Sequence, residues 1–126
     1  MDEHAALSSP EARFLKLLRD AREKEELAYP NDEVIAAYIE ATAACPTRAE
    51  ALHGAARLCR NKGMYQRGYE FAAKGLAIAY PSGALGVEDW IYEYGLLDEF
   101  AINAYWTGRY GECVNASDRA KGSCRG

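Results

Sequence analysis

Apolar residues recur along this chain every three or four positions, the spacing that places side chains on one face of an α-helix. The runs "FLKLLRDARE", "VIAAYIEATAA" and "ALHGAARLC" show this spacing most clearly. No stretch of appreciable length alternates apolar with polar residues, as a half-buried strand does. The pattern therefore predicts an all-α fold.

Six helices are expected between breaks rich in Pro and Gly. They begin near Pro10, Asn31, Thr47, Tyr65, Val87 and Tyr110. Thr47 and Glu50 have the spacing of a capping box, which predicts how the third helix begins. Gly63 is expected to end the third helix in a left-handed conformation, and Gly108 is expected to end the fifth. Residues 82–94 have the least regular pattern, and we expect a loop there that leads into the fifth helix.

The composition indicates one globular domain, because 126 residues with 49% apolar and 27% charged side chains suffice for a core. No apolar run approaches the roughly 20 residues of a membrane helix, so no membrane insertion is expected. The N-terminus is acidic and lacks the pattern of a signal peptide, which indicates a cytoplasmic location. A net charge of −4 argues against nucleic acid as a partner.

Cysteine and histidine offer no pattern for a metal or cofactor. The four cysteines are Cys45, Cys59, Cys113 and Cys124. None forms a C-x-x-C pair, and His4 and His53 do not lie at zinc-ligand spacing from them. Cys59 and Cys113 fall on apolar helix faces, so we expect small buried thiols and no cofactor.

The chain repeats itself after 45 residues: "NKGMYQRGY" and "YWTGRYGEC" both carry Gly-x-Tyr. Small or apolar residues meet their like at this shift in the pairs Leu52 and Leu97, Ala56 and Ala101, Cys59 and Ala104, Gly63 and Gly108, Tyr65 and Tyr110, and Gly68 and Cys113. Two helices that press together need small side chains where their backbones approach. The repeat therefore predicts at least two similar helical hairpins.

These hairpins resemble the tetratricopeptide repeat (TPR), a helical hairpin of about 34 residues. Residues 49–81 match best through their small residues and the closing Pro81, and residues 94–121 match second. Residues 15–46 form a degenerate unit. The resemblance implies a short TPR-like superhelix of three units, at about 10–46, 47–81 and 87–121, in one domain (1–121) with a flexible tail (122–126). The alternative is an unrelated helical bundle.

A narrower resemblance covers roughly residues 30–115. The stretches "DEVIAAYIEATAACPTRAEAL", "AAKGLAIAYP" and "VEDWIYEYGLLDEFAINAYWTGRY" are similar to the helical repeat domain that accompanies bacterial glycosyltransferase-like proteins. The matching residues include no catalytic residue, and the chain has no counterpart of the catalytic domain. The resemblance implies a freestanding remnant, a separate adaptor or a fragment of a longer protein, with a glycosyltransferase as a possible partner. A detached accessory domain that helps to position a glycan acceptor is the alternative.

The first helix of each hairpin in this family lines a concave face, which implies a site for a protein or peptide partner. The partner-binding residues expected there are His53, Arg57, Arg60, Asn61, Asp98 and Tyr105. His53, Arg57 and Arg60 follow one another at spacings of four and three, so they share one helix face. The resemblance implies that the two arginines pair with a carboxylate of the partner. Alternatively, they pair with Glu23 and Glu26 of the preceding unit.

Two aromatic side chains near the end of the fifth helix, Tyr105 and Trp106, have two possible places. Tyr105 and Trp106 either anchor a partner or, as such residues more often do, pack in the core. Asn103 is expected at the surface. Val114, on the last helix, would be exposed in a monomer, so a homodimer is expected.

Carboxylates and aromatics also cluster between Glu88 and Tyr105, a combination seen in sites that cleave carbohydrates. Acidic residues near a helix start and aromatics on a helical insert have an ordinary structural explanation as well. No phosphate-binding loop, Asp-x-Asp pair or nucleophile with an evident base accompanies the cluster. The expected function is therefore a non-catalytic scaffold, and a purely self-associating helical protein remains an alternative.

Overall fold

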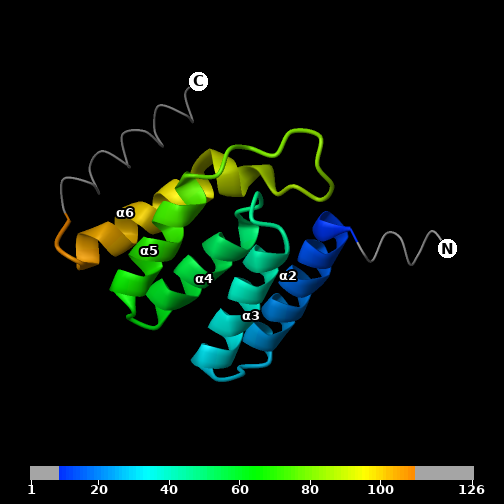
Figure 1. The fold of residues 1–126 in the computed structure, drawn as a ribbon. Coiled ribbons are helices and arrows are strands. Elements are labelled where there is room, and N and C mark those ends of the chain that lie inside the picture. Colours follow the sequence, from blue (N-terminus) through cyan, green and yellow to red (C-terminus); the bar gives the residue numbers. More distant parts are fainter. Residues whose placement is uncertain (1–8, 110–126) are drawn as a thin grey trace.

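The computed structural model describes residues 9–109 and is all-α within them, which confirms the predicted class (Figure 1). The α-helices are α2 (Pro10–Glu26), α3 (Asn31–Ala44), α4 (Glu50–Asn61), α5 (Tyr65–Leu76) and α6 (Leu96–Trp106), and the π-helical turn η1 (Ile91–Gly95) leads directly into α6. The sixth expected helix, from Tyr110, lies outside the described residues, as do Cys113, Val114, Cys124 and the tail.

Each α-helix packs against the next one along the chain, and α4 also contacts both α2 and α6. Figure 1 shows the helices side by side, with α2 and α3 at the N-terminal end and α5 and α6 at the other. The helices α2, α4 and α6 therefore form a continuous row, which we call the α2–α4–α6 row. This row is the framework of the candidate site.

One apolar core joins α2, α3, α4 and α5. Its large buried side chains are Phe14, Leu18, Val34, Ile35, Tyr38, Leu52, Leu58 and Phe71. Burying each apolar side chain of this size stabilises the fold by roughly 1.5–3 kcal/mol. The buried alanines, such as Ala21, Ala41 and Ala56, let the helix backbones approach closely. Cys45 and Cys59 are buried free thiols, as expected, and burial raises the pKa of Cys59.

The two Gly-x-Tyr turns have the same geometry at their glycines. Gly63 and Gly108 adopt φ angles of 75° and 86°. At each turn the residue after the glycine donates its N–H to a carbonyl five residues earlier: Met64 to Cys59 at 2.7 Å, and Arg109 to Ala104 at 2.8 Å. This is the Schellman arrangement that closes a helix with a left-handed residue. Both predicted helix ends are confirmed.

The predicted capping box at Thr47 is wrong. The helix α4 begins at Glu50, with Ala49 as N-cap and no side-chain cap. The Glu50 carboxylate instead accepts hydrogen bonds from Arg48 at 2.8 Å and from Tyr92 at 2.7 Å. A cationic partner in a buried site outweighs a weak local cap, and this combination of contacts ties the start of α4 to η1.

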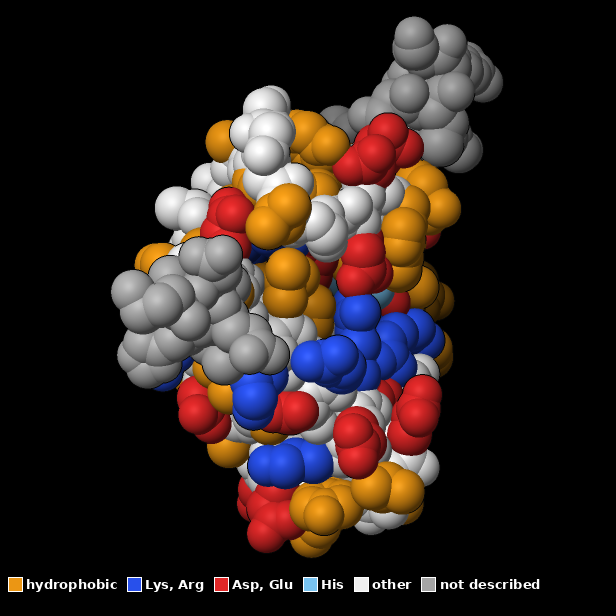
Figure 2. Space-filling view, turned by 90° about the vertical axis from the view of Figure 1, so that its right-hand side faces the viewer, with side chains coloured by type: hydrophobic (Ala, Val, Ile, Leu, Met, Phe, Trp, Pro, Cys, Tyr) orange, Lys and Arg blue, Asp and Glu red, His pale blue; other side chains and the backbone are white. Residues whose placement is uncertain are grey.

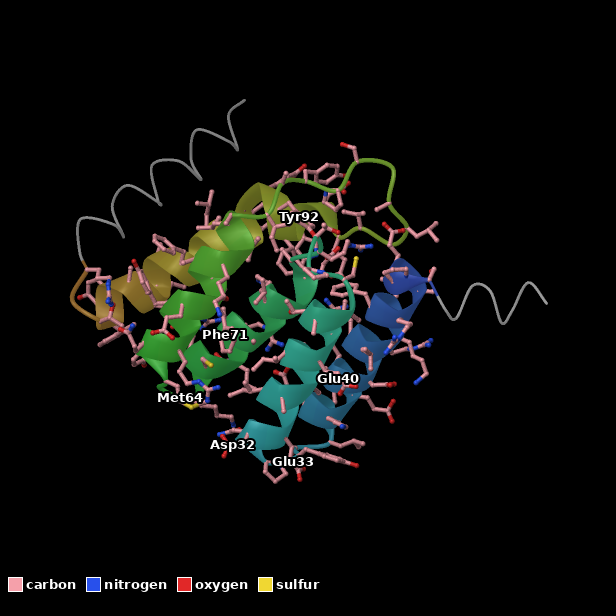
Figure 3. The ribbon with its side chains drawn as sticks, viewed as in Figure 1. Asp32, Glu33, Glu40, Met64, Phe71 and Tyr92 are labelled. Atoms are coloured by element: carbon pink, nitrogen blue, oxygen red, sulfur yellow. The ribbon has the colours of Figure 1, made fainter. Side chains whose placement is uncertain are left out.

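The buried Arg48, which pairs with Glu50, also holds the connection between α5 and η1. Arg48 donates to the carbonyl oxygens of Leu85 at 2.8 Å and Gly86 at 3.2 Å. Figure 3 shows Tyr92 at the end of this connection, where its hydroxyl accepts the Ala49 N–H at 2.8 Å. The predicted loop therefore has a fixed path, and it becomes helical at Asp89 rather than at Val87.

A methyl group added at Gly54 is expected to destabilise the fold by about 1–3 kcal/mol. Its Cβ would lie 2.5 Å from a ring carbon of Tyr38, which is fully buried and cannot move aside. Gly75→Ala is the matched control, because there the new Cβ meets the tip of Leu96, a flexible side chain. Urea denaturation compares the two variants. Equal losses of stability would contradict the rigid-ring explanation.

Candidate functional site

The candidate site is the exposed face of the α2–α4–α6 row. Figure 2 shows the side of the molecule that carries α2, where Lys and Arg side chains gather in one patch with Asp and Glu side chains above and below. On α4, His53, Arg57 and Arg60 follow one line, as the sequence predicts. Their surroundings decide which of them a partner could reach.

Arg57 forms an ion pair with Glu25 of α2. Its two terminal nitrogens donate to the two oxygens of Glu25, both at 2.8 Å, and the Tyr38 hydroxyl donates to the same carboxylate at 2.7 Å. Burial by itself would raise the pKa of Glu25, but the bonds from Arg57 and Tyr38 together lower it. The proposed alternative of pairing with Glu23 or Glu26 is wrong, because the acceptor is Glu25.

Arg60 forms an ion pair with Glu99 of α6. Its Nε donates to one oxygen of Glu99 at 2.6 Å, and a terminal nitrogen donates to the other at 3.1 Å. The hydrogen bond to Glu99 raises the pKa of Arg60. A third ion pair joins Arg22 of α2 to Glu88 at 2.7 Å. Ion pairs from α4 therefore fix both of its neighbours in the row.

His53 is not presented to a partner, which corrects the expectation from sequence. Its side chain is only 5% exposed, and the edge of its ring meets Trp90 at a centroid distance of 5.0 Å. Burial, together with the positive charges of Arg57, Arg22 and Arg60, lowers the pKa of His53 to about 4. The ring is therefore neutral at pH 7 and belongs to the packing between α4 and η1.

The other expected partner-binding residues are at the surface. Asn61 and Asp98 are exposed, and Tyr105 is half exposed. Asn103, expected at the surface, is fully buried, and its Nδ2 donates to the Glu99 carbonyl at 2.7 Å. A Cβ on Gly68 would lie 2.3 Å from Asn103 Oδ1, so the glycine is what lets α5 approach this buried amide.

An exposed aromatic and apolar stripe runs along the final helical segment. We call it the α6 stripe and define it by Trp90, Tyr94, Asp98, Ile102, Tyr105 and Trp106. Its five apolar members are between 38% and 58% exposed. Tyr105 and Trp106 thus lie at the surface rather than in the core. Trp90 and Tyr94 were not among the residues expected to bind a partner, although Tyr94, Asp98 and Ile102 follow one another at spacings of four.

The π turn keeps the α6 stripe in line. In η1 the Leu96 N–H bonds to the Ile91 carbonyl, five residues back, instead of four. The wider turn rotates Trp90 relative to a regular helix, so that its ring lies 5.9 Å from that of Tyr94. Isolated π turns of this kind occur frequently at functional sites. Their presence is not visible in a pattern of apolar positions.

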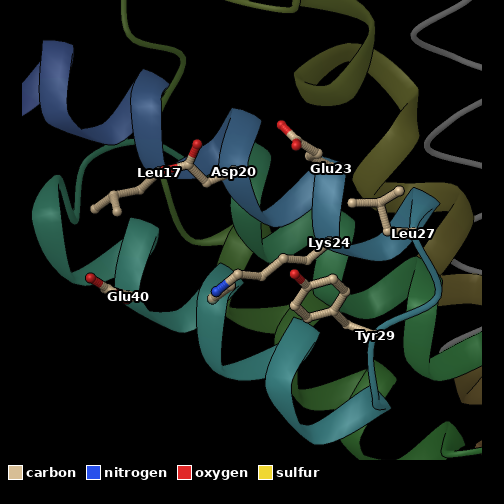
Figure 4. Close-up of a pocket in the computed structure, with 8 residues that line it drawn as sticks. Leu17, Asp20, Glu23, Lys24, Leu27, Tyr29 and Glu40 are labelled. Atoms are coloured by element: carbon tan, nitrogen blue, oxygen red, sulfur yellow. The ribbon is translucent and has the colours of Figure 1, made fainter.

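At least three hollows of the described residues lie elsewhere on the surface, and two of them differ in the chemistry of their walls. One, of about 340 Å³ between α2 and α3, is lined by acidic residues, Lys24 and the exposed Leu27 and Tyr29 (Figure 4). The other, of about 350 Å³, lies between α3, α4 and α5 and has apolar walls that include Phe71 (Figure 3). Neither contains residues of the α6 stripe.

The chemistry available to the carboxylates is limited by their contacts. Glu88 and Glu99 belong to the cluster of carboxylates and aromatics between Glu88 and Tyr105, and each forms an ion pair with an arginine. Within residues 9–109, no group of three or more His, Cys, Asp or Glu side chains is placed to hold a metal ion. No helix in the same range is long and apolar enough to cross a membrane.

No family model, no curated protein and no solved structure matches this chain. The arrangement of its own residues therefore carries the functional argument.

Proposed function

We propose that this protein is a non-catalytic, TPR-like scaffold that binds a protein or peptide partner through the concave face of the α2–α4–α6 row. The observation that carries the proposal is the α6 stripe. Aromatic residues dominate the energetics of protein interfaces, and a row of them at the surface of a small domain marks an interaction site. Of the residues expected from sequence, Asp98 and Tyr105 belong to this stripe.

The arginines of α4 have a supporting role in this proposal. Arg57 and Arg60 each donate two hydrogen bonds to a carboxylate of a neighbouring helix. A partner carboxylate would have to displace Glu25 or Glu99, and it would leave that group unpaired. The ion pairs instead hold the row in the shape that presents the stripe. Asn61 is exposed at the end of α4.

Selection from a random dodecapeptide library tests this proposal. Peptides enriched on the wild-type chain are expected to bind the triple variant Trp90→Ala, Tyr94→Ala, Ile102→Ala at least tenfold more weakly, because each truncated contact side chain costs about 1 kcal/mol or more. Isothermal titration calorimetry measures the affinities, and circular dichroism confirms that the variants are folded.

The matched control is the double variant Ile39→Ala, Leu85→Ala, which removes exposed apolar side chains outside the stripe. It is expected to bind the selected peptides like the wild type. Failure to enrich any peptide, or equal binding by the wild type and the triple variant, would refute the proposal.

A role in positioning a glycan acceptor is the second candidate. The exposed Trp90 favours it, because an aromatic face can stack on a sugar ring. Tyr92 does not contribute, since its hydroxyl is held by Glu50. Binding of oligosaccharides, but not peptides, by the wild type and its loss in Trp90→Ala would favour this candidate. Self-association through the stripe would instead appear as a dimer in sedimentation analysis.

A further inference from the structure

The charge of the final helical segment is one-sided. Between Lys74 and Arg109 the sequence contains five acidic residues and no Lys, Arg or His. The five are Glu88, Asp89, Glu93, Asp98 and Glu99. The α6 stripe runs through this segment, so every charged side chain that the segment itself contributes near the stripe is acidic. The cations that face it from α2 and α4 are Arg22, Arg57 and Arg60, whose charges act on His53 beside Trp90.

Part of this charge is neutralised inside the protein and part of it is not. Arg22 pairs with Glu88 at 2.7 Å, and Arg60 pairs with Glu99 at 2.6 Å. Within residues 9–109, none of the ion pairs involves Asp89, Glu93 or Asp98. All three are exposed, and among the described residues no cation pairs with them, although the Tyr80 hydroxyl donates a hydrogen bond to Asp89.

Asp98 lies within the stripe itself. It follows Tyr94 by four residues and precedes Ile102 by four, so the three side chains share one helix face. Trp90 and Tyr94 lie next to one another along the same line, with ring centroids 5.9 Å apart. An aromatic face attracts a cation placed within about 6 Å of its centroid, and a carboxylate nearby adds a direct ion pair. Indole and phenol faces beside an exposed acid thus suit a Lys or Arg side chain.

We propose that the partner segment bound by the α6 stripe is basic, with a Lys or Arg side chain that lies along Trp90 and Tyr94 and pairs with Asp98. This inference rests on the proposed function and names the chemistry of its partner. It reverses the charge expected from sequence, where Arg57 and Arg60 were to receive a partner carboxylate. Those arginines already hold Glu25 and Glu99, whereas Asp98 forms no ion pair with any of residues 9–109.

Three pools of fluorescent dodecapeptides test the inference with the full chain. The pools share one randomised apolar pattern and differ only at four fixed positions, which are all Lys, all Gln or all Glu. Fluorescence anisotropy is expected to give the order Lys, Gln, Glu from strongest to weakest, with the Lys pool bound about tenfold more tightly than the Gln pool. The preference for Lys is expected to shrink at high salt.

Asp98→Asn is expected to reduce the affinity of the Lys pool several-fold and to leave the Gln pool unchanged. Asp32→Asn is the matched control, since it removes one exposed acid on α3, which is not among the elements that pack against α6, and is expected to change neither. Trp90→Leu is expected to weaken the Lys pool more than the Gln pool, because it keeps apolar area but removes the aromatic face.

The outcomes separate the two proposals. Equal binding of the Lys, Gln and Glu pools that still depends on the stripe would overturn the basic partner and leave the scaffold function standing. Preference for the Glu pool would overturn the inference in favour of the arginines. Absence of binding by every pool would overturn the proposed function, and the inference would fall with it.

Discussion

Arg48→Met is expected to lower the free energy of unfolding by about 3–5 kcal/mol. Arg48 and Glu50 are both fully buried, and two hydrogen bonds, at 2.8 and 3.2 Å, join them. Removal of the guanidinium would leave a buried carboxylate without a cation, and the Leu85 and Gly86 carbonyls would each lose a donor. Urea denaturation of the wild type and the variant measures the loss.

The double variant Arg48→Met, Glu50→Gln separates the cost of an orphaned charge from the value of the ion pair. It removes both charges, so it is expected to be more stable than Arg48→Met alone. Arg57→Met is a second comparison, because its pair with Glu25 is partly exposed and water can solvate the remaining carboxylate. A loss in Arg48→Met no larger than the loss in Arg57→Met would contradict the explanation by burial.

The stability that the buried Arg48–Glu50 ion pair contributes is expected to depend on pH through Glu50. Burial would raise its pKa, but the hydrogen bonds from Arg48 and Tyr92 together lower it below the ordinary value of 4.5. Because the folded state binds this proton less tightly than the unfolded state, the contribution to stability is complete above pH 4.5 and is lost as the pH falls below it. Acid is therefore expected to loosen the connection held by Arg48.

Local sequence patterns were sufficient for the α-helical class of residues 9–109 and for several of the helix ends. The first helix begins at Pro10, as expected, and in the structure the Ser9 Oγ caps it by accepting the Ala12 N–H at 3.1 Å. The turns at Gly63 and Gly108 follow from the one residue type that adopts a positive φ at little cost. These features depend on neighbours within about five positions along the chain, which is the range over which spacing is informative.

Contacts between distant residues could not be predicted in the same way. Glu50 fits a capping box as well as a buried ion pair, and only the approach of Leu85 and Tyr92 decides between them. Similarly, the spacing of Arg57 and Arg60 predicts a shared face, but not that Glu25 and Glu99 from other helices occupy it. Tertiary contacts decided each of these cases.

The candidate site shows the same division. Helix register placed Asp98 on the partner-binding face, whereas for Tyr105 it left both that face and the core open. His53 was misplaced, because the register does not reveal that Trp90 covers its face. The π turn changes the register by one residue, so no regular helical pattern extended backwards from Asp98 positions Trp90 correctly. The stripe was thus recognisable in part from sequence and defined only in the fold.

A decrease from pH 7 to pH 5 is expected to lower the free energy of unfolding by about 2 kcal/mol through His53 alone. In the folded protein, burial and the nearby arginines lower its pKa from 6.5 to about 4. The unfolded chain therefore binds the proton more tightly than the folded one. The full stability is present above about pH 6.5, and it declines as the pH falls towards 4.

His53→Phe isolates this effect, because it keeps a ring against Trp90 and removes the titrating group. Urea denaturation at pH 7, 6 and 5 measures the free energy of unfolding of the wild type and the variant. The contributions of the carboxylates are common to both proteins, so they cancel when one free energy is subtracted from the other. The variant is expected to lose much less stability than the wild type over this range. Parallel losses in both proteins would mean that the folded His53 accepts its proton near pH 6.5, and hence that water reaches the ring between α4 and η1.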